Sequence, residues 1–279
     1  MKGSNVRSIA VRFLLAVSLG ASGLVLAGVI SKYLAIPFID VTLLVIVTWF
    51  LYRTEGKSVK ALGLNITAKH LLFLVFGLLI GIAALGLENF LRSVYTGERW
   101  IISSPIDQLA LWKVLYLILP SVIVQELVFR GYLFTKTIEV TSVATANVIL
   151  GILFMLVHVL DRDVMQNTGQ LIFLIVSIPI GHLLFATALL KSKTLYFPIG
   201  LHWGNNWASS CLIGYGKNEN TIFHINNPYV FQSWKAFIIL LLIFNVFFLL
   251  VTFIIWKWNG IPFKGALLPT SASKITDAE

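Results

Sequence analysis

Apolar runs of about 20 residues recur along the chain, and they constrain its fold more than any other feature. A helix that crosses a bilayer needs about 20 apolar residues, because it must satisfy its backbone N–H and C=O groups internally. Hydrophobic residues make up 58% of the 279 residues and charged residues only 12%, whereas soluble domains hold about 25% charged residues. A water-soluble fold could not bury so much apolar surface, so the excess must face lipid.

Short polar segments divide the sequence into about eight predicted spans. The spans are residues 9–31, 37–53, 70–90, 113–134, 142–160, 170–190, 195–215 and 235–258. The first run resembles a signal peptide, but its apolar part is long and further spans follow, so we interpret it as an uncleaved span. The prediction is an all-α, polytopic transmembrane helical bundle in one domain over residues 1–259. A disordered cytoplasmic tail over residues 260–279 is expected to follow.

The net charge of +9 does not indicate nucleic-acid binding, because Lys and Arg are spread through short segments between spans and form no stripe. A positive-inside bias explains their distribution. The basic segments assigned to the cytoplasm contain Arg53, Lys57, Lys60, Lys69, Lys136, Lys191, Lys193, Lys257, Lys264 and Lys274. The segments assigned to the outside contain Glu98, Asp107, Asp161, Asp163 and Glu219. The alternation predicts N-in and C-in termini, and we expect a multi-pass protein of the bacterial plasma membrane.

Three of the predicted spans contain polar groups at membrane depth. Such groups cost about 2.5–3.5 kcal/mol each on insertion, so they usually face a cavity and have a partner. The segments are S-V-I-V-Q-E-L-V-F-R in the fourth span, F-M-L-V-H in the fifth and G-L-H-W-G-N-N-W in the seventh. Their polar side chains are Gln125, Glu126, Arg130, His158, His202 and Asn206.

Helical spacing indicates which of these groups can meet. Residues four apart share a helix face, so Glu126 can pair with Arg130, and His202 lies on the same face as Asn206. Gln125 points about 100° away from Glu126. A carboxylate, two imidazoles and amide donors from converging helices are what a hydrolytic site requires: a group that activates water and donors for the oxyanion. Taken singly, each of these groups is also typical of helix packing. A further histidine, His182, lies in the sixth predicted span, and we interpret it as a helix-packing residue.

The ordered motifs E-E-x-x-x-R, F-x-x-x-H and H-x-x-x-N/D resemble the CAAX prenyl protease and bacteriocin-processing family of intramembrane endopeptidases, also called the Abi family. The element K-A-L-G-L at residues 60–64 is similar to that family as well. The resemblance implies that His158 activates water and that His202 and Asn206 stabilise the oxyanion. It further implies that Glu126 and Arg130 brace the site. The expected substrate is a membrane-anchored or lipidated peptide that is cut near the bilayer surface.

Gln125 departs from this pattern, because the family has a glutamate at that position. An amide cannot accept a proton from water at neutral pH. Three accounts follow: an inactivated variant, a natural pseudo-protease, or an enzyme in which Glu126 or His158 is the base. The third account is disfavoured for Glu126, because pairing with a cationic guanidinium reduces the basicity of a carboxylate.

The sequence does not demand a cofactor. The family is often described as metalloproteases, and Glu126, His158 and His202 would meet the ligand count of a catalytic zinc. The spacing H-E-x-x-H is lacking, however, and the single cysteine, Cys211, offers no Cys-based site. The main prediction is therefore an intramembrane endopeptidase that Gln125 impairs. The alternatives are an inactive binding, immunity or scaffold protein, and a transporter, for which a single strong intramembrane acid is a poor basis.

Overall fold

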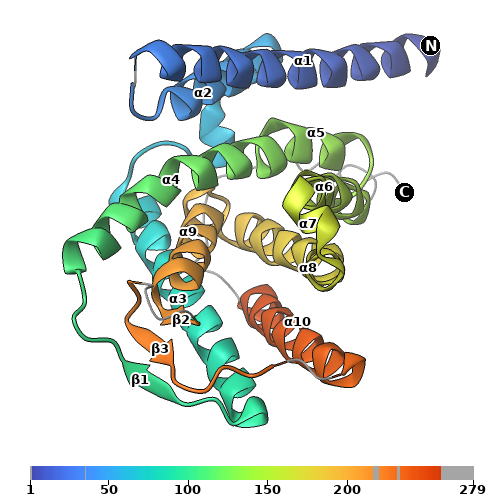
Figure 1. Cartoon of the computed structure of the whole chain (residues 1–279). Helices are drawn as coiled ribbons and strands as arrows, with labels where there is room; N and C mark the ends of the chain where they lie inside the picture. Colours follow the sequence, from blue (N-terminus) through green and yellow to red (C-terminus); the bar gives the residue numbers. More distant parts are fainter. Residues whose placement is uncertain (1, 35, 216–219, 231–232, 259–279) are drawn as a thin grey trace.

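The structure is a computed structural model, and it describes residues 2–34, 36–215, 220–230 and 233–258. About 80% of the chain is helical. The predicted tail at residues 260–279 lies outside the described residues. Figure 1 shows the helices stacked around α9, with α1 and α2 along one side and a small sheet at one end.

A helix is found in each predicted span. The helices are α1 Lys2–Leu34, α2 Ile39–Thr54, α3 Ala68–Thr96, α4 Gln108–Arg130, α5 Tyr132–Val140, α6 Val143–Val159, α7 Arg162–Gln166, α8 Thr168–Ser192, α9 Tyr196–Cys211 and α10 Trp234–Lys257, with a short 3₁₀ helix, η1, at Val59–Leu62.

Five helical stretches of the described chain are long and apolar enough to cross a membrane. They are Ile9–Leu34, Ala68–Thr96, Gln108–Val140, Thr168–Ser192 and Trp234–Lys257. Helices α2, α6 and α9 hold 16, 17 and 16 residues, fewer than the 20 or so that a bilayer requires. The protein is therefore a polytopic integral membrane protein, while eight crossings and the sidedness of the termini stay predictions.

The all-α prediction is confirmed, and a small three-stranded sheet accompanies the helices. It consists of β1 Trp100–Ile102, β2 Ile213–Gly214 and β3 Phe223–Ile225, in the order β1-β3-β2. Strands β1 and β3 are antiparallel, and β2 and β3 are parallel. The strands come from segments between helices, where backbone groups need partners outside a helix. We call this part of the bundle the sheet end.

A charged network around Glu55 lies at the opposite end. The carboxylate accepts hydrogen bonds from the Tyr132 hydroxyl at 2.6 Å and from the Lys136 ammonium at 3.0 Å, and it pairs with Lys57 at 3.1 Å and Arg12 at 3.2 Å. Partial burial opposes ionisation, but these hydrogen bonds outweigh it and lower the pKa of Glu55 to about 2. The network joins α1, α2 and α5, and it brings two of the predicted basic segments to the same end.

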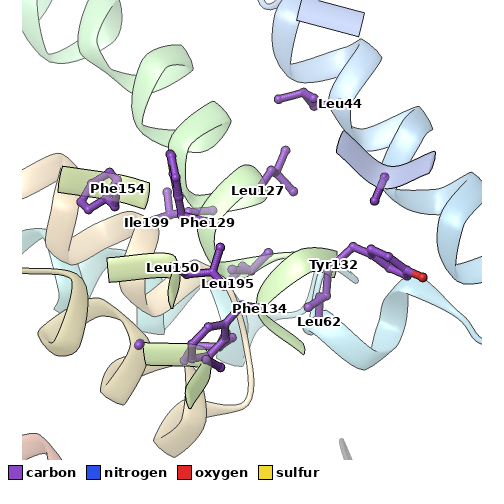
Figure 2. Close-up of a cluster of buried hydrophobic side chains, with 14 of the residues drawn as sticks. Leu44, Leu62, Leu127, Phe129, Tyr132, Phe134, Leu150, Phe154, Leu195 and Ile199 are labelled. Carbon is purple, nitrogen blue, oxygen red and sulfur yellow. The ribbon is translucent and has the colours of Figure 1, made fainter. Parts of the chain in front are cut away.

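The main apolar core lies beside α4, α5, α6 and the start of α9. Figure 2 shows Phe129 of α4 beside Phe154 of α6, with Ile199 of α9 nearby. The ring centroids of Phe129 and Phe154 are 4.8 Å apart. This packing holds together the helices that carry the polar residues singled out from the sequence.

The K-A-L-G-L element joins this core to the corner between α8 and α9. Leu62 is fully buried, and its carbonyl accepts a hydrogen bond from the Leu195 backbone at 3.0 Å. The Gly63 carbonyl accepts one from the Thr194 hydroxyl, also at 3.0 Å. Gly63 has φ +62°, and a Cβ there would lie 2.6 Å from that of Thr194, so only glycine fits. The element fixes the start of α9.

Candidate active site

Four glycines allow α9 to approach α3 closely. Gly77 and Gly81 of α3 face Gly200 and Gly204 of α9, and a Cβ added at any of them would lie less than 3.0 Å from the backbone of the other helix. Pairs of glycines four residues apart are typical of helix crossings in membranes, where small residues let backbones touch. His202 lies between the two glycines of α9, so the crossing sets its depth in the bundle.

Two tryptophans hold α9 against α4 from another side. The indole N–H of Trp203 donates to the Leu115 carbonyl at 2.8 Å, and that of Trp207 donates to the Leu111 carbonyl at 3.1 Å. The two indoles are one helical turn apart on α9, so they hydrogen-bond to α4 at two successive turns. Helix α9 is thereby oriented between α3 and α4.

The first and third motifs meet at one carboxylate oxygen. Oε1 of Glu126 accepts a hydrogen bond from Nη1 of Arg130 at 3.1 Å and one from Nδ1 of His202 at 2.8 Å. The side chains of Glu126 and Arg130 are fully buried, and His202 is 5% exposed. The pair expected from spacing is present, and the imidazole completes a cluster in which the carboxylate offsets the buried guanidinium charge.

Aromatic rings enclose this cluster. The Arg130 guanidinium lies 4.2 Å from the centroid of the Phe154 ring and 5.2 Å from that of Phe185. The ring of Phe185 also stacks on His202, with centroids 4.7 Å apart. Rings at such distances stabilise a cation and exclude water. The Phe of the F-x-x-x-H motif is therefore part of the site wall.

His158 contacts the Phe154 ring, which also borders the cluster. Its imidazole lies 4.6 Å from the Phe154 ring, which is 6.1 Å from that of His202. Nδ1 of His158 lies 2.7 Å from the Phe154 carbonyl. A carbonyl can only accept, so Nδ1 is assigned the proton and Nε2 keeps a lone pair. His158 is half-buried, and in this tautomer it can accept a proton.

Two residues singled out from the sequence do not join the cluster directly. The Gln125 amide donates to the Ser121 hydroxyl at 3.1 Å, one turn away on the same helix. Asn206 is half-buried one turn beyond His202, and its side chain makes no hydrogen bond within the part of the chain that the structure describes. Both lie on the less buried side of the site, whereas Glu126 and Arg130 are sealed.

The residues do not fit the zinc site that the sequence left open. Among residues 2–34, 36–215, 220–230 and 233–258, no three His, Cys, Asp or Glu side chains gather to hold a metal ion. Oε1 of Glu126 is already shared by Arg130 and His202. A buried guanidinium beside that oxygen would also repel a cation.

His182, for which the sequence predicts a packing role, lies beside the cluster. Its ring lies 6.2 Å from the Phe154 ring and 5.9 Å from that of Phe134. Both ring nitrogens are buried without a hydrogen-bond partner in the described chain, as are Nε and Nη2 of Arg130 and Oε2 of Glu126. Such unpaired buried polar atoms are uncommon in proteins, and here they gather around one cluster. The glycine pairs were also missed, although their four-residue spacing was visible.

These features define a polytopic helical membrane protein with a buried carboxylate, guanidinium and imidazole cluster on α4 and α9, and with His158 of α6 close to it. Residues 107–208 match the family described as type II CAAX prenyl endopeptidase Rce1-like. The match runs from the start of α4 to near the end of α9, so it covers all three motifs. It confirms the resemblance to the CAAX protease and Abi family, which is a family of proteases. No curated protein and no solved structure matches the chain.

Proposed function

We propose that the protein is an intramembrane endopeptidase of the CAAX and Abi type, with an activity that Gln125 impairs. The main support for this proposal is that Arg130 and His202 both donate to one buried oxygen of Glu126, inside the segment that matches the family. Its substrates are peptides that a lipid or an apolar segment anchors in the membrane. The plasma membrane of a bacterium stays its expected location.

Each residue of the candidate site has a separate role in the proposed reaction. Nε2 of His158 accepts a proton from water while the water oxygen attacks the carbonyl carbon of the scissile bond. His202, protonated on both ring nitrogens, donates from Nε2 to the oxyanion of the tetrahedral intermediate while its Nδ1–H stays on Glu126. The Asn206 amide supplies a second hydrogen bond to the same oxyanion. The C–N bond then breaks as the proton on His158 passes to the leaving amine. Glu126 and Arg130 hold His202 in place.

Gln125 leaves this scheme without the carboxylate that the family has at this position. Its amide can orient a water but cannot take a proton from it. A glutamate would fit the same place, because the Ser121 hydroxyl that now accepts from the amide could donate to a carboxylate. Introducing that glutamate should therefore restore activity and leave the fold unchanged.

The test compares the protein that carries Gln125 with the Gln125→Glu variant, each purified in lipid nanodiscs and supplied with a fluorogenic, lipid-anchored peptide. A positioned base contributes about 10²- to 10⁴-fold, so Gln125→Glu should raise kcat/KM by that factor. Adding His158→Ala to this variant should remove the gain. Equal inactivity of both forms against a broad panel of anchored peptides would overturn the proposal.

The second candidate is a catalytically inactive relative that binds a membrane peptide or protein as an immunity or scaffold factor. The Gln125 amide favours it, since the only acid of the cluster, Glu126, is committed to Arg130 and His202. In this case His158→Ala and His202→Ala should reduce cellular function only as far as they reduce protein abundance. A selective loss of function at normal abundance would instead favour the enzyme.

A further inference from the structure

A cavity of about 240 Å³ lies between α3, α8, α9 and α10, and Ile213 of β2 also lines it, at the sheet end. Its polar lining comes mainly from Glu88, Asn89 and Arg92 of α3 and from Tyr215. Phenylalanines of α8 and α10 supply much of its apolar wall. On α9, Ser209 lines the cavity seven residues after the histidine of the buried cluster, about 10 Å along the helix axis. The cavity is therefore separate from the proposed active site.

The Glu88 carboxyl accepts no hydrogen bond from the described residues, and the Arg92 guanidinium attracts it only at longer range. Glu88 is 6% exposed, and its side chain makes no hydrogen bond or ion pair with the residues that the structure describes. Arg92, one turn further on, is engaged by Glu98 through two hydrogen bonds of 3.1 Å. The Asn89 side chain accepts from the Tyr215 hydroxyl at 2.9 Å and donates to its own helix. The neighbours are satisfied, and the buried carboxyl is not.

A second, larger cavity adjoins the first. It shares Phe173 of α8 and Phe237 of α10 with the Glu88 cavity, and it has a volume of about 660 Å³. Gln170 and Trp234, close to the first residues of α8 and α10, also line it. A ligand that occupied both cavities would pass Phe173 and Phe237 before its far end reached Glu88.

We propose that these cavities form a binding site for a primary ammonium group on a slender aliphatic stem. An ammonium carries three donors and a full positive charge, which match a buried carboxylate that accepts no hydrogen bond from the described residues. A divalent cation would need several oxygen ligands, and among the described residues Glu88 alone supplies a carboxylate to the cavity lining. The stem lies between Phe173 and Phe237. Such a group comes from a free alkylamine or polyamine, or from a lysine side chain of a peptide.

The test is a titration of the full chain in phosphatidylcholine nanodiscs with n-pentylamine, followed by calorimetry. Saturable binding of n-pentylamine, at least tenfold tighter than that of n-pentanol, is expected, because the alcohol has the same stem without the charge. Glu88→Gln should weaken amine binding at least tenfold. Asp163→Asn removes the same charge from an exposed position on α7, and it should leave the affinity unchanged.

Equal affinity for the amine and the alcohol, or amine binding that Glu88→Gln leaves unchanged, would overturn the proposal. Ser209→Trp provides a second variant, because Ser209 lines the cavity but is exposed. The bulky ring should block amine binding and keep the carboxyl intact, and undiminished binding would again count against the site. Tighter binding of a lysine tripeptide than of n-pentylamine supports a peptide as the source, and tighter binding of spermidine supports a free polyamine.

Discussion

His202 donates a hydrogen bond of 2.8 Å to Glu126, a residue 76 positions earlier in the chain. The oxygen that accepts this bond also accepts the hydrogen bond from Arg130. One carboxylate therefore connects α9 to α4 and compensates a guanidinium that has no contact with solvent. Breaking either contact leaves a charge or a polar group buried without compensation.

Removing the guanidinium should destabilise the protein strongly. Arg130→Met leaves the Glu126 carboxylate buried without its counter-charge, which costs about 3–5 kcal/mol. The measurement is the free energy of unfolding in mixed micelles. The double variant Glu126→Gln/Arg130→Met removes both charges and should recover much of the loss. If the single variant is as stable as the natural protein, the pair does not contribute as the structure indicates.

His158 should affect turnover more than stability. In the Gln125→Glu background, His158→Gln should lower kcat by about 10²-fold or more, because Nε2 no longer exchanges protons with water and the leaving amine. The half-buried position should keep the change in thermal midpoint small. His224→Gln, in strand β3, is a matched control that should leave kcat unchanged. Equal effects of the two substitutions would exclude a special role for His158.

The crossing of α3 and α9 should not tolerate a side chain. Gly204→Ala would place its Cβ within 3.0 Å of the α3 backbone, and such overpacking costs about 1–3 kcal/mol or more. Gly181→Ala in α8 is the control, because no atom lies within 4 Å of its added Cβ. That substitution should be neutral or stabilising by up to about 1 kcal/mol. Thermal unfolding of both variants decides between these outcomes.

The Glu55 network should make stability depend on pH in the acid range. Its pKa is lowered from the ordinary value of 4.5 to about 2, so folding favours the ionised carboxylate. The stabilisation is complete above pH 4.5 and is lost as the pH falls from there toward 2. Glu55→Gln should lower stability at pH 7 by about 1–3 kcal/mol. It should also flatten the decline in the thermal midpoint below pH 4.5, and an unchanged slope would contradict the assignment.

Features that depend on local sequence could be predicted for this chain. The apolar runs located the helices, because lipid requires each span to satisfy its own backbone. The pairing of Glu126 with Arg130 followed from the helical repeat, since both residues lie on one helix. Residues 125–206 could be compared with a family motif by motif. The reactions assigned to these residues stay proposals.

Contacts between distant segments needed the tertiary structure. The sequence did not indicate that His202 would hydrogen-bond to Glu126. It also did not indicate that Gln125 and Asn206 would lie outside the cluster. Those outcomes depend on the depth and rotation at which α9 crosses α3 and α4, which the facing glycines and the two indoles determine. The three-stranded sheet and the cavity that Glu88 lines also depend on contacts between distant segments. A pattern along one helix specifies a face, and only the packing of several helices decides what that face meets.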